Sequence, residues 1–294
     1  MTKVGQLFVI ATPIGNLDDI TKRAVDVLKS VDFIAAENAR VTGVILQRFN
    51  ISTPIVPYHD FSDEKARERI VLSLIEGKSV GLVSDAGTPL ISDPGFKLVE
   101  LARKEKVLVT PIPGACSVIA ALCVSGLPTD SFQFDGFIPS KSSARLSYFK
   151  SILFQERTII VFESKHRIGN SLIVLSEVLQ CDRKIFIARE ITKRFESHFN
   201  GTAKQCLDWL NSDCDQGKGE FVLVIGGCDD SVLTEQNTLR ALEILDLLKD
   251  KVSLSDAVKI ARPPSIPIGN ATQVIVAGEN LDNDFTIGTS ACSQ

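Results

Sequence analysis

The sequence predicts an α/β protein made of two α/β domains, and three observations support this. Short runs of β-branched and aliphatic residues alternate with longer amphipathic stretches along most of the 294 residues. Several of these runs end in loops rich in Gly, Pro, Asp and Ser. Hydrophobic residues make up 44% of the chain and charged residues 23%, a balance typical of a globular protein with a sizeable core.

The first part of the chain alternates strand and helix in close succession. Apolar, mostly β-branched runs predict strands at 7–11, 33–36, 55–57, 80–83 and 107–112. Apolar residues at helical spacing, such as Ile20, Ala24 and Leu28, predict helices at 18–31, 62–76, 94–104 and 117–125. This order favours a mostly parallel sheet covered on both faces.

Turn-forming residues then predict the domain boundaries. Pro113-Gly114, Gly126 and Pro128 favour an N-terminal α/β domain at 1–118 and a C-terminal α/β domain at 119–230. The second domain is expected to hold helices at 146–153, 168–179 and 203–210 and strands at 158–162, 184–188 and 221–225. Two short helices, at 239–248 and 254–260, predict a small helical segment at 234–261, and residues 262–294 are expected to form an irregular tail.

Five predicted strand ends are followed by polar loops. The most distinctive, residues 83–95, reads V-S-D-A-G-T-P-L-I-S-D-P-G, and the others are 12–16, 111–114, 162–164 and 188–190. Open α/β sheets bind ligands beyond the carboxyl ends of their strands, where Gly lets the backbone approach and Asp or Ser can bond hydroxyl or ammonium groups. For any one of these loops alone, a simple turn is the better explanation. Together they are consistent with a site for one small molecule.

Other motifs exclude several function classes. Gly15-Asn16 lacks the G-x-G-x-x-G spacing of dinucleotide-binding folds, and the chain has no P-loop. The seven Cys form no Cys-x-x-Cys pair and have no His at ligand spacing, so neither a disulfide framework nor a metal site is expected. No apolar run is long enough to span a bilayer, and residues 7–11 are too short for a signal sequence. The chain is therefore expected to be cytoplasmic, with no membrane partner.

Five stretches of the chain resemble one known family. They are TPIGNLDDIT at 12–21, LVSDAGTPLISDPG at 82–95, GLPTD at 126–130, GFIP at 136–139 and AREITK at 188–193. In order and spacing they are similar to the ribosomal RNA small subunit methyltransferase I family, within the tetrapyrrole methylase superfamily, from about residue 6 to 227. The resemblance implies two α/β domains of tetrapyrrole-methylase type with a cofactor cleft between them, a small helical C-terminal segment and a homodimer. It also implies methyl transfer from S-adenosyl-L-methionine to a cytidine 2′-hydroxyl in the decoding region of 16S rRNA in the small ribosomal subunit.

The resemblance also assigns cofactor-binding positions in this chain. According to the resemblance, eleven residues line or abut the cofactor cleft: Pro13, Ser84, Asp85, Ala86, Gly87, Pro113, Gly114, Glu163, Ser164, Ala188 and Glu190. They coincide with the five polar strand ends.

Methyl transfer to a ribose hydroxyl also benefits from a nearby base. The ionisable groups at the strand ends are Asp85, Glu163, His166, Glu190 and Lys193, of which Glu163, Glu190 and Lys193 are chosen as catalytic residues. Glu163 and Glu190 are equally well explained as ion-pair partners of Arg167 or Arg189. A phosphate or solvent contact explains His166 better than a catalytic role.

Charge is distributed unevenly along the chain, as RNA binding by an acidic protein requires. The net charge is −4, but 11 basic and five acidic residues give the segment 141–194 a charge of +6, which leaves −10 elsewhere. The expected RNA-binding residues are Lys141, Arg145, Lys165, Arg167, Arg189 and Lys193. Solvated helix faces are the alternative, and they explain Lys150 and Arg183 well.

Two departures from the family pattern leave alternatives open. Where the family usually reads Glu-Asp-Thr-Arg-His-Thr, this chain has Glu37-Asn-Ala-Arg-Val-Thr42, so a carboxylate, a hydroxyl and an imidazole are missing together. If the family's Asp and His help to hold the substrate, binding is weaker here. The family also has a small C-terminal helical module, which residues 253–261 resemble, and after residue 261 the resemblance ends. The alternatives are a methyltransferase acting on a tetrapyrrole precursor, a diphthine-type methylase acting on a protein, and a catalytically impaired ribosome-binding protein.

Overall fold

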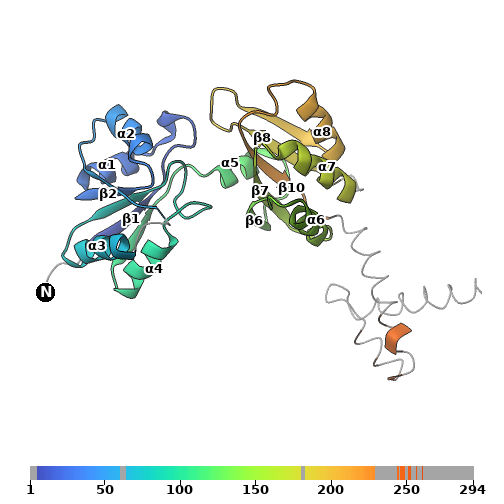
Figure 1. Cartoon of the computed structure of the whole chain (residues 1–294), viewed down its shortest axis with the longest axis horizontal. Helices are drawn as coiled ribbons and strands as arrows, with labels where there is room; N and C mark the ends of the chain where they lie inside the picture. The colour runs from blue at the N-terminus through green and yellow to red at the C-terminus, as the bar shows by residue number, and fades with distance from the viewer. Residues whose placement is uncertain are drawn as a thin grey trace, which may run out of the picture. The chain divides into compact units, whose positions relative to one another are not determined.

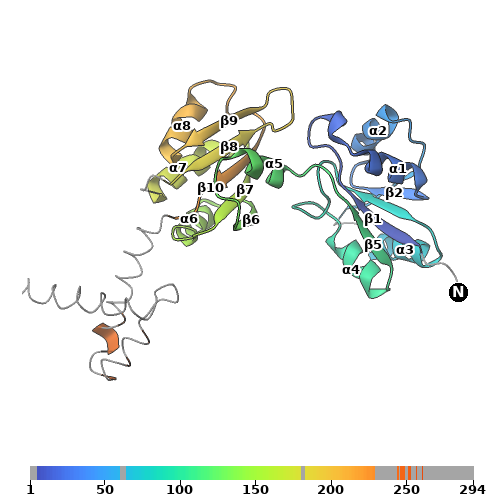
Figure 2. The same ribbon diagram turned by 180° about the vertical axis from the view of Figure 1, so that it is seen from behind.

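The structure is a computed structural model of the chain, and it describes residues 5–59, 64–179 and 183–228, together with residues 244, 246–248, 251, 252, 256 and 260. The chain divides into two units, residues 1–227 and 228–294. The first unit contains the two sheets shown in Figures 1 and 2. The predicted tail at 262–294 and most of the predicted helical segment at 234–261 lie outside the described residues.

The first sheet is parallel and five-stranded. Its strands are β1 (Gln6–Ile10), β2 (Phe33–Ala36), β3 (Ile55–Pro57), β4 (Val80–Val83) and β5 (Leu108–Ile112), in the order β3-β2-β4-β1-β5. Every strand pair in it is parallel. The order reverses at β1, so the chain leaves β1 and β4 at neighbouring points of the same edge, where doubly wound folds bind ligands.

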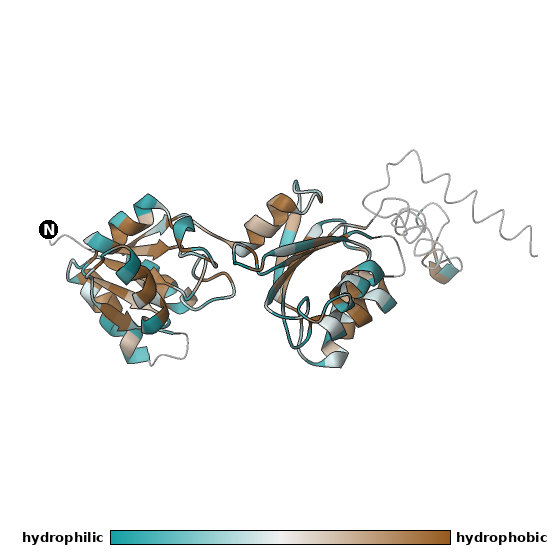
Figure 3. Cartoon of the chain, turned by 90° about the horizontal axis from the view of Figure 1, so that it is seen from above, coloured by the Kyte–Doolittle hydropathy of each residue, from teal (hydrophilic) through white to brown (hydrophobic). Residues whose placement is uncertain are grey.

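Helices cover both faces of this sheet. On one face α3 (Glu64–Ile75) and α4 (Phe96–Lys104) pack around Leu7, Val80 and Leu82. On the other face α1 (Lys22–Ser30) and α2 (Ala39–Arg48) pack around Ile10 and Ile34. Figures 1 and 2 show the two helix pairs on opposite sides of the strands, and in Figure 3 apolar residues follow the strands while polar residues lie on the outer helix surfaces.

The second sheet is mixed. Its strands are β6 (Phe132–Phe137), β7 (Thr158–Ser164), β8 (Ile185–Arg189), β9 (Ser197–Gly201) and β10 (Glu220–Ile225), in the order β6-β7-β10-β8-β9. Only β6 and β7 run parallel. The larger core lies under α6 (Ser142–Ser151), α7 (Ile168–Val178) and α8 (Ala203–Asn211), and α5 (Ser117–Val124) covers the other face.

The two-sheet α/β fold confirms the predicted fold class, and the element positions agree closely with those expected. Three elements were missed: α2, β6 and β9. The β6 strand was hidden by Gly136, which has a φ of 71° and lies at an irregularity in the β6–β7 register. The β9 strand is short and mostly polar, and its hydrogen bonds with β8 define it better than its composition does. The predicted helix at 18–31 is a 3-10 turn (η1, Leu17–Asp19) followed by α1.

The predicted boundary at residue 118 falls inside α5. The buried side chains of α5, including Val118 and Ala121, pack against the second sheet. The boundary itself stays a prediction. Within the described ranges, no helix is both long and apolar enough to cross a membrane.

Candidate functional site

A cavity of about 570 Å³ opens among the loops that follow the strands of both sheets. The loops after β1, β2 and β4 and the start of α5 line one part of it, through Ile14, Glu37, Asp85, Ala86, Gly87, Thr88, Ile91, Ser92, Asp93, Cys116 and Ser117. The second sheet lines the rest, through Phe137, Phe162, Glu163, Ser164, Lys165, His166, Glu190, Ile191, Lys193, Gly219, Glu220, Phe221 and Val222. Loops at the carboxyl ends of β4, β7 and β8, all singled out from the sequence, therefore meet at one cavity.

Close backbone contacts hold these loops in place. The N–H and C=O of Gly87 both bond the backbone of Thr12, at 3.0 and 2.9 Å, which ties the loop after β4 to the loop after β1. Gly87 has a φ of 77°, and a Cβ there would lie 3.1 Å from Cγ2 of Ile14. A Cβ at Gly15 would overlap Cγ of Lys193 in the loop after β8. Larger residues at either glycine would therefore push the walls of the cavity apart.

Four of the six non-glycine residues with positive φ in the described ranges lie in two loops that line the cavity. Leu90 (φ 75°) and Ser92 (φ 63°) lie in the loop after β4, and Glu190 (φ 52°) and Thr192 (φ 64°) lie in the loop after β8. This conformation is unfavourable for residues that carry a Cβ, so the surrounding contacts must hold it. Such strain at the walls of one cavity is typical of a ligand site.

Three carboxylates meet on the wall formed by the first sheet. The N–H of Asp85 lies 3.4 Å from Oε2 of Glu37. Burial raises the pKa of Asp93 to about 6; a hydrogen bond from Ser84 opposes the rise, and the charges of Glu37 and Asp85 add to it. Among the described residues, Oδ1 of Asp85 is buried with no hydrogen-bond partner. This wall is therefore suited to a ligand that brings positive charge or hydroxyl donors.

An ion-pair network occupies the opposite wall. The ammonium of Lys193 lies 3.1 Å from Glu190 and 2.8 Å from Glu220. Burial lowers the pKa of Lys193, but its hydrogen bonds to the two carboxylates outweigh burial and raise it overall. Burial likewise raises the pKa of Glu190, but the Glu220 N–H and Lys193 outweigh it and lower it overall. At neutral pH Lys193 is therefore protonated and cannot accept a proton, and the lowered pKa of Glu190 makes its carboxylate a weak base.

Glu163, expected to be catalytic, is instead an ion-pair partner. Its Oε1 lies 2.8 Å from the guanidinium of Arg167 and accepts the Ser164 N–H, while its Oε2 accepts the hydroxyl of Ser171. Both oxygens are thus engaged, and the carboxylate is fully buried. Glu163 fixes the turn from β7 into α7, so its choice as a catalytic base is corrected.

The predicted cofactor residues divide into two groups. Those that line the cavity are Asp85, Ala86, Gly87, Glu163, Ser164 and Glu190. Those that do not line it are Pro13, Ser84, Pro113, Gly114 and Ala188. Pro13 and Ser84 are buried next to lining residues, and Pro113 and Gly114 are exposed just before Cys116. Ala188 is buried and packs with Val222 and Phe162, which line the cavity, so it lies beneath the cleft wall and its part in cofactor binding stays a prediction.

Two of the predicted RNA-binding residues are structural. Arg145 is 4% exposed, and its guanidinium donates to the backbone oxygens of Pro139 and Ser140. Arg189 is 8% exposed, and it donates to the backbone oxygens of Phe195, Asp215 and Lys218. A buried guanidinium that is committed to backbone carbonyls does not reach RNA phosphates, so both assignments are corrected.

The remaining cations of that segment differ in their surroundings. Arg183, attributed to a solvated helix face, is buried and donates to the backbone oxygens of Ile152, Leu153 and Gln155. Lys193 lines the cavity and is paired with Glu190. Arg167 adjoins the cavity and is paired with Glu163. Lys141 and Lys165 are exposed, and Lys165 lines the cavity.

Several lining residues were missed from the sequence. Asp93 lies in the loop 83–95 and Phe137 in the GFIP stretch, so both belonged to recognised motifs, but nothing in their spacing placed them at a site. Glu220 begins the last strand and carries no local signal. The described structure also explains Asn38: its side chain accepts the N–H of Arg40 as the N-cap of α2, which Asp would do equally well.

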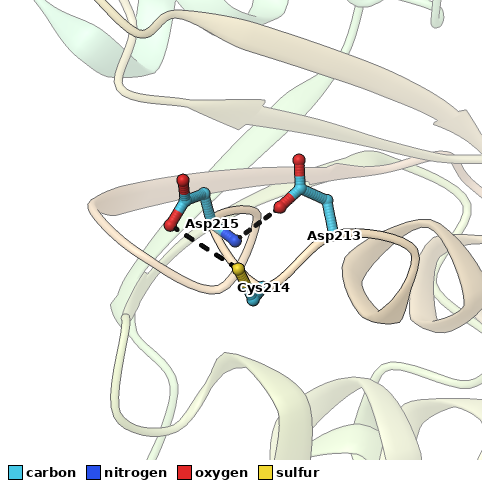
Figure 4. A group of neighbouring side chains, drawn as sticks. All are labelled: Asp213, Cys214 and Asp215. Carbon is cyan, nitrogen blue, oxygen red and sulfur yellow. Dashed lines mark hydrogen bonds between the residues drawn. The ribbon is translucent and has the colours of Figure 1, made fainter.

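One group of possible metal ligands occurs in the described part of the chain, and it lies in an exposed turn outside this cavity. Figure 4 shows Asp213, Cys214 and Asp215, with Asp213 accepting the Asp215 N–H at 2.8 Å. Asp215 is paired with Lys218 at 2.5 Å. These contacts are those of a polar turn, and they account for the clustering without an ion.

The family model of the Tetrapyrrole (Corrin/Porphyrin) Methylases matches residues 6–206. The chain belongs to this methylase family. Within it, the chain is 45% identical over 254 residues to the ribosomal RNA small subunit methyltransferase I of Vibrio cholerae, covering 86% of this chain and 88% of that one. It is 42% identical over 256 residues to that of Haemophilus influenzae, covering 87% and 90%. The family predicted from the five sequence stretches is confirmed.

Solved structures of other methylases share the fold at low identity. A diphthine synthase matches with a TM-score of 0.57 at 15% identity over 79% of this chain and 94% of that one. A uroporphyrin-III C-methyltransferase from Thermus thermophilus, complexed with S-adenosylhomocysteine, matches with a TM-score of 0.51 at 15% identity over 76% and 97%. These likenesses concern the fold alone.

Proposed function

We propose that this chain transfers a methyl group from S-adenosyl-L-methionine to small-subunit ribosomal RNA, at the 2′-hydroxyl of a cytidine in the decoding region of 16S rRNA. The charge of the cavity is the observation that carries the proposal. Its lining includes six carboxylates, Glu37, Asp85, Asp93, Glu163, Glu190 and Glu220, but only two lysines, Lys165 and Lys193. This excess favours a small cationic ligand over a phosphate.

The residues present fit such a cofactor. S-adenosylmethionine supplies a methyl group on a positively charged sulphur, and it also carries hydroxyl and ammonium donors. The buried Oδ1 of Asp85 is an acceptor without a partner in the described ranges, as a hydroxyl or ammonium donor requires. Ile14, Ile91, Phe137 and Phe162 provide apolar surface for a purine and exclude water from the reacting groups. Asp85, with the backbone around Gly87, would hold the cofactor.

Lys193 is proposed to act through its charge and not as a base. Its raised pKa keeps it protonated at neutral pH, within a network that fixes its position. A positive charge beside the acceptor hydroxyl would stabilise the oxygen as its proton passes to solvent. Glu190 keeps its proposed place in the site as the partner that orients this ammonium.

Sequence identity and surface charge favour ribosomal RNA over a tetrapyrrole precursor or a protein as the substrate. The uroporphyrin and diphthine enzymes share the fold at 14–17% identity, whereas the relatives named for ribosomal RNA are 40–45% identical over most of the chain. The exposed cations Lys141 and Lys165 also suit a polyanionic partner. A ribosomal substrate places the chain in the cytoplasm, and a homodimer is proposed by analogy with the family.

The direct test is transfer of labelled methyl from S-adenosylmethionine to small ribosomal subunits purified from a strain that lacks this gene. Mass mapping should place the label on the 2′-oxygen of one cytidine. Label on another atom would contradict the proposed acceptor. Cofactor binding without any label would favour a ribosome-binding protein that has lost its chemistry.

The cofactor affinity should depend on pH through Asp93. Its pKa of about 6 means that this carboxyl is largely protonated at pH 5 and ionised at pH 7.5. A cationic ligand favours the ionised form, so binding at pH 5 should be up to about 10-fold weaker than at pH 7.5. Calorimetry at both pH values measures the affinity for S-adenosylmethionine.

Glu37, Asp85 and His166 share the cavity with Asp93, so Asp93→Asn is the matched control, and it should flatten the pH dependence. An unchanged dependence in that variant would assign the titration to another group.

The two exposed cations should serve the RNA and not the cofactor. Lys141→Glu with Lys165→Glu is expected to weaken binding to small ribosomal subunits about 10-fold or more at low salt, because it reverses two charges that attract phosphates. Affinity for S-adenosylmethionine should not fall, since Lys165→Glu adds a negative charge to a cavity proposed to bind a cation. Lys150→Glu with Lys184→Glu makes the same charge change at other exposed positions, and an equal loss there would show that only net charge matters.

A further inference from the structure

A second cavity, of about 620 Å³, adjoins the candidate site and is called the side cavity here. It shares Glu190 and Gly219 with the first cavity, so the two lie on either side of a common wall. Its other lining residues are Arg189, Arg194, Phe195, Glu196, Ser197, Asp213, Asp215, Gln216 and Lys218. The loop between β8 and β9 therefore contributes to both cavities.

An exposed aromatic ring stands in this side cavity. Phe195 is 64% exposed, the largest exposure of any described Phe. The loop that carries it is well fixed, because the N–H of Lys193 bonds the Glu190 carbonyl and the N–H of Thr192 bonds the Glu196 carboxylate. The Phe195 carbonyl is held in turn by Arg189. These hydrogen bonds fix the backbone that carries Phe195, so its exposed ring is available to a base that stacks on it.

The neighbours of this ring suit a nucleobase. The guanidinium of Arg194 lies 5.5 Å from the ring centroid of Phe195, so a cation and an aromatic face are presented together. Unpaired bases stack on such aromatic and guanidinium surfaces. The carboxylates of Glu196, Asp213 and Asp215 disfavour a phosphate, but they can accept hydrogen bonds from a base amino group.

We infer that the side cavity binds an unpaired base of the acceptor RNA strand, stacked on Phe195 beside Arg194. The inference rests on the proposed function and extends it by naming where the RNA base lies. The shared wall of Glu190 and Gly219 sets the base next to the cavity proposed for the methyl donor, as transfer to a ribose of the same strand requires.

Kinetics on the full chain test the inference. With small ribosomal subunits as substrate, Phe195→Ala should raise the KM for subunits about 5- to 100-fold, since base–aromatic stacking is lost. The Kd for S-adenosylmethionine should not change, and Phe195→Trp should restore the KM. Phe154→Ala is the matched control: Phe154 is 39% exposed and precedes the amino end of β7, the end opposite the cavity.

A spectroscopic readout separates this inference from the proposed function. The chain has one Trp, Trp209, which stacks on Phe199. In a Trp209→Phe background, Phe195→Trp should show indole fluorescence that a short single-stranded RNA quenches, whereas Phe154→Trp should show none of this quenching. The quenching needs no methyl transfer, so it would be seen even if the subunits were not methylated.

Two results would overturn the inference. One is an unchanged KM for Phe195→Ala together with unquenched indole fluorescence. The other is a change in the oligomeric state of the Phe195→Ala variant, measured by sedimentation, while its KM for subunits stays unchanged. That result would mean that a second copy of the chain covers Phe195.

Discussion

Replacing Asp85 by Ala and Gly87 by Leu is expected to abolish S-adenosylmethionine binding, with a loss of affinity above about 100-fold. Asp85 supplies the buried acceptor oxygen that has no partner within the described residues. Gly87 is bonded to Thr12 through both backbone groups at a φ of 77°, and a side chain there would press on Ile14 at 3.1 Å. The change therefore removes an acceptor and opens the wall at the same place.

Calorimetry on the double variant and on each single variant measures this effect. Asp85→Asn keeps the shape and removes the charge, so it should show the electrostatic part alone. Gly43→Leu is the control for added bulk: Gly43 lies on α2, and apart from its chain neighbours and the backbone of its own helix no atom lies within 4 Å of a Cβ placed there. Unchanged affinity in the double variant would remove this cavity from the proposed cofactor site.

Replacing Arg189 by Met is expected to destabilise the second α/β half by about 3 kcal/mol. Three backbone carbonyls, of Phe195, Asp215 and Lys218, lose their charged donor, at distances of 2.9, 2.8 and 2.6 Å. These carbonyls belong to the two segments that carry the side cavity, so RNA binding should fall together with stability.

Urea unfolding measures the change in stability, and Lys150→Met is its control because Lys150 is an exposed cation on α6. Arg189→Lys should rescue little, since an ammonium cannot span three carbonyls as a guanidinium does. An Arg189→Met variant of normal stability that bound RNA weakly would restore the earlier assignment of Arg189 to direct RNA contact.

The roles of Glu163 and Arg189 could not be predicted from the sequence. Both residues lie at strand ends, where site residues were expected, and both do adjoin a cavity. Their roles depend on what faces them: Glu163 meets Arg167 and Ser171, and Arg189 meets carbonyls more than 20 residues away. The same residue types at the same strand ends are compatible with either role, so only the contacts distinguish them.

The sequence by itself determined the α/β class, the order of most elements, the family and the loops that form the site, because periodicity, turn residues and motifs are local properties of the chain. The tertiary structure decided which groups meet across those loops. Asp93 acquires its pKa from burial beside Glu37, which lies 56 residues earlier, and Phe195 is exposed because its loop is tied to Arg189 and Glu190. Burial and charge pairing depend on distances in space, which the order of residues alone does not give.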